Sequence, residues 1–173
     1  TGPKAVTEEK QNLVHNPWWS RDGEYLVAKK GFTSTRSIPA GEIWLFHAGG
    51  GEGLQLIERP NGPKDQKNIA EPSLSPDGRY LAYLAGRAGR ASLRVRQIAT
   101  GSDVEVLPAR DAALESPAFS PDGNYVYFLT RKPENPNYRA LFQIPSLGGT
   151  PRELVFDVDS RASFSPDGKR IAF

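Results

Sequence analysis

A four-fold repeat constrains this chain more than any other feature of its sequence. Each copy has Asp-Gly at its centre and apolar residues on both sides. The copies lie at 16–28, 71–83, 116–128 and 161–173. Their aspartates are spaced 55, 45 and 45 residues apart. A period of about 45 residues is typical of the four-stranded blade of a β-propeller.

The Asp-Gly pairs have the residue types of a tight turn between two strands. Pro precedes Asp in three copies and presets the first corner of the turn, whereas Arg21 takes its place in the first copy. The Asp side chain bonds the backbone beyond it, and Gly takes a positive φ without steric cost. A ring of aspartates around one cation is less favoured, because calcium ligands lie only about 2.3–2.6 Å from the metal. We therefore expect structural turns at Asp22, Gly23, Asp77, Gly78, Asp122, Gly123, Asp167 and Gly168.

The remainder of each period supplies two further strands. Third strands are expected at 42–46, 92–98 and 140–144, and fourth strands at 54–57, 104–107 and 153–156. The sequence therefore predicts an all-β chain, 1–173, that forms a single propeller unit of four-stranded antiparallel blades. The predicted blades lie at about 16–57, 72–107 and 117–156, with an incomplete blade from 162–173 together with 1–15. This makes a partial ring of about 3.5–4 blades.

The repeated Phe-Ser-Pro-Asp-Gly run, followed by an apolar strand, resembles the TolB-like propeller repeats. These repeats are similar to WD repeats in plan but lack the Trp-Asp signature. The segment 16–83, especially its runs 32–37 and 41–45, is similar to propellers that precede bacterial amidohydrolase domains. From residue 93 onward, the runs 123–128 and 147–152 are similar to propellers attached to bacterial kinases and winged-helix regulators. The resemblance implies a non-catalytic module that binds or organises partners, and it favours a periplasmic or extracytoplasmic location.

Composition and motifs exclude several classes of chemistry. The chain has 173 residues, no Cys and a net charge of +2, which argues against thiol catalysis, Cys-based zinc sites and bulk binding of nucleic acid. No apolar run approaches the ~20 residues of a membrane span. His15 and His47 have no partner at metal-ligand spacing, and the Gly-rich segment 47–53 is interpreted as a flexible hairpin rather than a phosphate cradle. We expect no enzyme activity, no metal and no cofactor.

The loops that follow the second strands are the best candidate for binding. They carry eight basic residues against the single acid Glu134, and they share a face with the mixed-charge connections between blades. These basic residues are Lys29, Lys30, Arg36, Arg87, Arg90, Arg131, Lys132 and Arg139. The loops form either a solvated rim or a surface for an acidic protein segment or an anionic glycan. The adjacent Trp18 and Trp19 point to opposite faces of a strand, so that one or both pack between blades or form an exposed aromatic patch.

An incomplete ring leaves apolar faces and sheet edges without partners. We therefore expect self-association, most simply a two-fold dimer of half-rings. The chain begins at Thr1 and has no Met, so we expect a processed or excised piece. Three interpretations of function stay open. The chain is a binding and scaffolding module, an accessory propeller of an amidohydrolase-type enzyme, or an excised or recombined fragment with no native function of its own.

Overall fold

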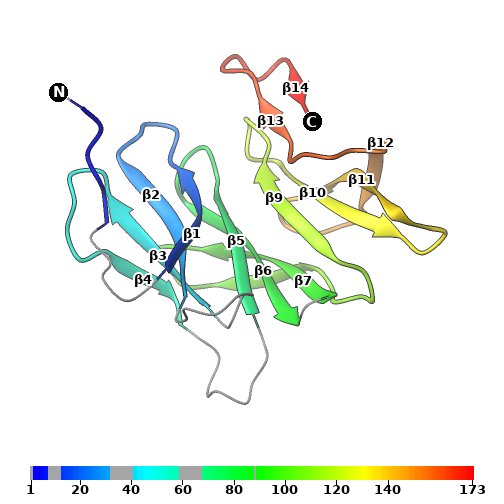
Figure 1. Cartoon of the computed structure of the whole chain (residues 1–173), viewed down its shortest axis with the longest axis horizontal. Helices are drawn as coiled ribbons and strands as arrows, with labels where there is room; N and C mark the ends of the chain where they lie inside the picture. The colour runs from blue at the N-terminus through cyan, green and yellow to red at the C-terminus, as the bar shows by residue number, and fades with distance from the viewer. Residues whose placement is uncertain (1, 8–12, 32–40, 59–67, 88) are drawn as a thin grey trace.

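The computed structural model describes residues 2–7, 13–31, 41–58, 68–87 and 89–173. These residues form strands, turns and loops and no helix, so no helical segment there is long and apolar enough to cross a bilayer. The strands make three four-stranded antiparallel sheets and one two-stranded sheet (Figure 1). The predicted all-β propeller class, with four antiparallel strands in each blade, is confirmed.

In each large sheet the strands are paired in the order of the sequence. Blade 1 contains β1 (Leu13–Trp19), β2 (Tyr25–Gly31), β3 (Gly41–His47) and β4 (Leu54–Ile57). Blade 2 contains β5 (Asn68–Leu74), β6 (Tyr80–Arg87), β7 (Arg90–Gln97) and β8 (Asp103–Leu107). Blade 3 contains β9 (Leu114–Phe119), β10 (Tyr125–Lys132), β11 (Asn135–Pro145) and β12 (Arg152–Phe156). The fourth hairpin contains β13 (Ser163–Phe164) and β14 (Ile171–Ala172).

The fourth repeat forms a hairpin whose two strands pair only with each other among the described residues. The segment 1–15 had been expected to add strands to this incomplete blade. Its described residues 2–7 form no strand, and 13–15 begin β1 of blade 1 instead. The remaining residues of that segment lie outside the described part of the chain.

The first strand of each of the three four-stranded blades contains a β-bulge. Asn16, Glu71 and Ser116 occupy equivalent positions, each directly before a proline, and have φ of 50°, 52° and 55°. The strand register shifts at all three places. A bulge bends its strand and increases its twist. In blade 2 the bulge also links neighbouring blades, because the backbone N–H of Ser116 donates to the Glu71 carboxylate.

Apolar side chains fill the spaces between consecutive sheets. One buried cluster joins blades 1 and 2 and includes Ile43 and Leu81. A second joins blades 2 and 3 around Phe128, which is fully buried. A third packs blade 3 against the segment that leads into the fourth hairpin, where Leu141 contacts Val158 and its neighbours. Apolar side chains therefore hold each blade against the next one along the chain.

The first strands of the four repeats end close together. Their last residues, Trp19, Leu74, Phe119 and Phe164, line one small hollow together with the turn residues that follow them. The guanidinium of Arg161, just before β13, lies 5.2 Å from the ring of Trp18 in β1. Trp18 packs against the cluster between blades 1 and 2, whereas Trp19 is 48% exposed. The four repeats therefore form part of a propeller ring.

Candidate binding pocket between the first two blades

The four Asp-Gly turns share one hydrogen-bond network. In each turn the Asp Oδ1 accepts from the hydroxyl of the serine two residues before it and from the backbone N–H two residues after it. The same serine Oγ accepts the backbone N–H five residues further on. The glycines have φ between 70° and 76°. The network therefore holds each carboxylate in a fixed orientation at the end of its hairpin.

These hydrogen bonds also fix the charge of the turns. The Ser20 hydroxyl and the Glu24 N–H hold the pKa of Asp22 below its ordinary value. Asp122 and Asp167 have pKa values lowered by the equivalent serine and backbone donors. In Asp77, partial burial raises the pKa, but the Ser75 hydroxyl and the Arg79 N–H outweigh it, so the net direction is again downward. All four carboxylates are therefore anionic at neutral pH.

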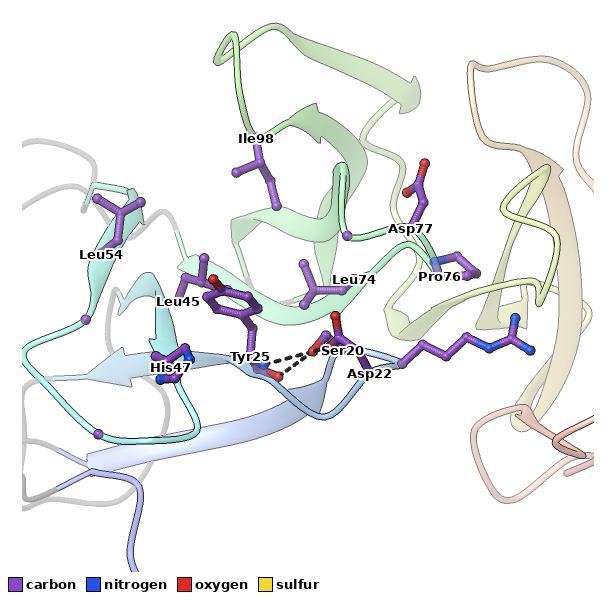
Figure 2. Close-up of a pocket in the computed structure, with 14 residues that line it drawn as sticks. Ser20, Asp22, Tyr25, Leu45, His47, Leu54, Leu74, Pro76, Asp77 and Ile98 are labelled. Carbon is purple, nitrogen blue, oxygen red and sulfur yellow. Dashed lines mark hydrogen bonds between the residues drawn. The ribbon is translucent and has the colours of Figure 1, made fainter.

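Two of these turns border a pocket of about 790 Å³ between blades 1 and 2. Figure 2 shows the apolar side chains of the pocket between the turn carboxylates at one end and Leu54 at the other. The apolar walls come from both blades and consist of Tyr25, Leu45, Leu54, Leu74 and Ile98. Leu54 is 58% exposed and Tyr25 is 39% exposed, so part of this apolar surface faces solvent. A concave apolar surface with a few polar groups at its edge is the usual form of a binding site.

The Gly-rich loop after β3 forms part of the wall of this pocket. Gly50 and Gly53 line it, and their φ values of 94° and 80° suit glycine. A Cβ at Gly53 would lie 2.7 Å from the ring of Phe46. The imidazole of His47 accepts the Gly49 N–H at Nδ1 and lies edge-on to Tyr25, with ring centroids 5.4 Å apart. The sequence interpretation of this loop as a plain hairpin therefore missed its contribution to a pocket wall.

The pocket at the equivalent position between blades 2 and 3 is smaller and more polar. It holds about 280 Å³ and is lined partly by Ser75, Asp122, Asn124 and Ser146. Ser146 and Ile98 are equivalent residues, since each directly follows the third strand of its blade and donates its N–H to the loop before the second strand. Replacement of an isoleucine by a serine removes one apolar wall. The large apolar pocket is therefore a particular feature of blades 1 and 2 rather than a consequence of the repeat.

The basic residues expected to form a binding face lie at the opposite ends of the blades. Lys29 and Lys30 are in β2, Arg87 ends β6, Arg90 begins β7, Arg131 and Lys132 end β10, and Arg139 is in β11. Arg36 lies outside the described residues. The structure thus gathers the described ones at the hairpins after the second strands, away from the Asp-Gly turns.

Many of these basic side chains interact with the chain itself. Arg139 bonds Glu115 at 3.1 Å and Asp159 at 3.3 Å, and Lys132 lies 2.6 Å from Glu153. Arg90 pairs with Asp111 at 3.0 Å, and Arg131 approaches Glu115 at 3.9 Å.

The two lysines of β2 differ in environment. Lys30 lies 4.4 Å from the Trp44 ring centroid. Lys29 is only 3% exposed, and burial lowers its pKa to about 8, with the nearby Glu71 acting in the other direction. Binding of an anionic partner by the basic residues stays a prediction.

No group of three or more His, Cys, Asp or Glu residues suited to a metal is found in the described part of the chain. The pocket contains four ionisable groups besides Tyr25, namely Arg21, Asp22, His47 and Asp77. Both carboxylates already accept hydrogen bonds in their turns. The arrangement is thus suited to holding an apolar group beside a fixed negative charge.

Comparison with known proteins supports the repeat architecture. No protein-family model matches the chain. The chain is 30% identical over 104 residues to "Protein TolB homolog" of Chlorobium chlorochromatii (strain CaD3), which covers 59% of this chain and 22% of that protein. The chain therefore spans less than a quarter of the length of this curated relative.

Solved structures share the fold at low sequence identity. The structure of TolB from Acinetobacter baumannii has a TM-score of 0.72 and 20% identity, over 93% of this chain and 37% of that one. The β-propeller domain of the trilobed protease from Pyrococcus furiosus, described as having an open velcro topology, has a TM-score of 0.61 and 15% identity. That match covers 94% of this chain and 48% of the domain. The likeness to amidohydrolase- and kinase-linked propellers stays a prediction. The chain is built of TolB-like β-propeller blades.

Proposed function

We propose that this chain is a non-catalytic binding module that docks a protein segment in the pocket between blades 1 and 2. The observation that carries the proposal is the pocket itself. It is about 790 Å³ in volume, apolar, and bordered by the exposed side chains of Tyr25 and Leu54. The smaller, more polar position between blades 2 and 3 supports a specific role for this one.

Two further observations support a binding role over a catalytic one. The carboxylates at the pocket, Asp22 and Asp77, have lowered pKa values, whereas a general acid needs a raised one. The TolB-like fold supports a binding or scaffolding module. The relatives also support a periplasmic or extracytoplasmic location, which we propose for this chain.

The test uses a random dodecapeptide library displayed on phage and selected on the immobilised chain. Selected clones should bind the unmodified chain and lose most of that binding with Leu54→Gln. Leu147→Gln is the matched control, because Leu147 is 77% exposed and lies at the smaller position between blades 2 and 3. Clones that bind Leu54→Gln as well as the unmodified chain, or that respond equally to both variants, would overturn the proposal. Failure to enrich any clone would also overturn the proposal.

Self-association is a second candidate, favoured by the exposed apolar residues of the fourth hairpin. Ile171 is 38% exposed and Phe173 is 47% exposed, and β14 has one paired neighbour among the described strands. We propose that a second copy covers this face and completes a larger ring. Light scattering should give twice the 19.0 kDa of one chain, and Phe173→Glu should return the chain to a monomer. A monomer at all concentrations would contradict this candidate.

A further inference from the structure

We propose that the pocket between blades 1 and 2 selects an extended protein segment in which an apolar side chain is followed closely by a lysine or arginine. This inference rests on the proposed function and names the chemistry of its partner. It follows from the two different ends of the pocket. Figure 2 shows Leu54 at one end and the side chains of Asp22 and Asp77 at the other, with Leu45, Tyr25 and Leu74 between them.

The apolar end favours an aliphatic or aromatic side chain. Its walls are hydrocarbon from both blades, and Leu74 is buried beneath them while Leu54 stands largely in solvent. Covering apolar surface contributes roughly 25 cal/mol for each Å² removed from water. The glycines at 50 and 53 leave room for a partner backbone to approach without meeting side chains.

The other end favours a cation. Asp22 Oδ1 is occupied by Ser20 at 2.5 Å and the Glu24 N–H at 3.0 Å, which leaves Oδ2 to accept from outside. No ion pair to Asp22 is present among the described residues, whereas Asp77 lies 3.7 Å from the Arg79 Nε. The rigid turn fixes the Asp22 carboxylate before a partner arrives, so little conformational entropy is lost when a charged hydrogen bond forms.

Other charges around the pocket modulate this preference. Arg21 also lines the pocket and opposes a cation, and the Asp77 carboxylate already lies 3.7 Å from the Arg79 Nε. His47 already accepts the Gly49 N–H at Nδ1 and rests against Tyr25. The preference for a cation therefore rests on the Asp22 carboxylate, which has no ion pair among the described residues. We therefore expect a selectivity of a few fold rather than an absolute requirement.

The test compares three fluorescein-labelled Gly/Ser dodecapeptides that carry two leucines followed by two lysines, two glutamines or two glutamates. Affinity is measured by fluorescence polarisation at low salt. The lysine peptide should bind about two- to fivefold more tightly than the glutamine peptide, as for an exposed ion pair, and the glutamate peptide should bind most weakly. Asp22→Asn keeps an oxygen acceptor in the turn and should abolish the preference. The control Asp167→Asn makes the same change in the fourth hairpin and should leave the preference intact.

The outcomes separate the two proposals. Equal binding of all three peptides, with loss in Leu54→Gln, would leave the proposed function standing and overturn the inference. Tightest binding of the glutamate peptide would also overturn it, as would a lysine preference that survives Asp22→Asn. Binding of no peptide would overturn both proposals. A preference that disappears in Asp22→Asn and weakens as NaCl is raised supports the inference.

Discussion

The serine of the repeated turn offers the sharpest test of the fold, because one chemical change can be made in different surroundings. Ser75 is 3% exposed, and its Oγ donates to Asp77 Oδ1 at 2.6 Å and accepts the Tyr80 N–H at 2.9 Å. Ser20 makes the same two bonds, at 2.5 Å and 2.9 Å, in a half-buried turn. Replacement of either serine by alanine removes both bonds.

The magnitude depends on whether water can replace the lost partner. A hydrogen bond between neutral groups is worth about 1 kcal/mol net, one to a charged group about 1.5–3 kcal/mol, and an unsatisfied buried donor costs about 1–3 kcal/mol. Ser75→Ala should therefore lower the free energy of unfolding by about 3 kcal/mol. Ser20→Ala should lower it by about 1 kcal/mol, because water reaches that turn.

Urea denaturation with linear extrapolation measures both values. Thermal unfolding provides a second reading, in which Ser75→Ala should lower the Tm by about 6–12 °C for a chain of this size. Ser120→Ala repeats the experiment in a third turn, where the serine is 5% exposed, and should match Ser75→Ala. Equal losses in Ser20→Ala and Ser75→Ala would refute the argument that burial determines the cost.

Other parts of the fold give three further predictions. Phe128→Ala should lower the free energy of unfolding by about 3–5 kcal/mol in urea, because Phe128 is fully buried between blades 2 and 3; a loss below 1 kcal/mol would contradict that packing. Glu71→Ala should lower the free energy of unfolding by about 1–3 kcal/mol, because it leaves the Ser116 N–H without its acceptor. Glu71→Gln keeps an acceptor and should lower it by less. Equal losses in the two variants would exclude the link between the bulges. In the folded chain the pKa of Lys29 is lowered to about 8 from its ordinary value of 10.5, so between these pH values the unfolded chain holds more protons. The free energy of unfolding should therefore rise by up to about 3 kcal/mol, relative to Lys29→Met, as the pH increases from 8 to 10.5. Parallel pH profiles of the two proteins would contradict the lowered pKa.

The repeat made the blades predictable, because turn chemistry and strand patterns are local. The Asp-Gly turns and the third and fourth strands lie where the sequence placed them. The bulges at Asn16, Glu71 and Ser116 were not predicted. A residue directly before proline is ordinarily extended, so nothing in the local sequence signals a positive φ. Only the common Pro at 17, 72 and 117 marks these positions.

The pocket could not be predicted from the repeat, because it depends on how two blades face each other. Its walls combine residues that are far apart in sequence, such as Tyr25 and Ile98. One signal was present, since the Gly-rich run after β3 has no counterpart of similar length in the other blades. The pairing of the basic residues with Glu115, Glu153 and Asp159 depends on side-chain geometry, which the sequence does not specify.

The most direct test of the account is to map the lysine peptide onto the isotopically labelled chain by amide chemical shifts in NMR. The account predicts that the largest changes occur at Asp22, Tyr25, Leu54 and Ile98, which border the pocket between blades 1 and 2. Changes confined to Arg87, Arg90 and Arg131 at the opposite ends of the blades would contradict it. The absence of any localised change would contradict it as well.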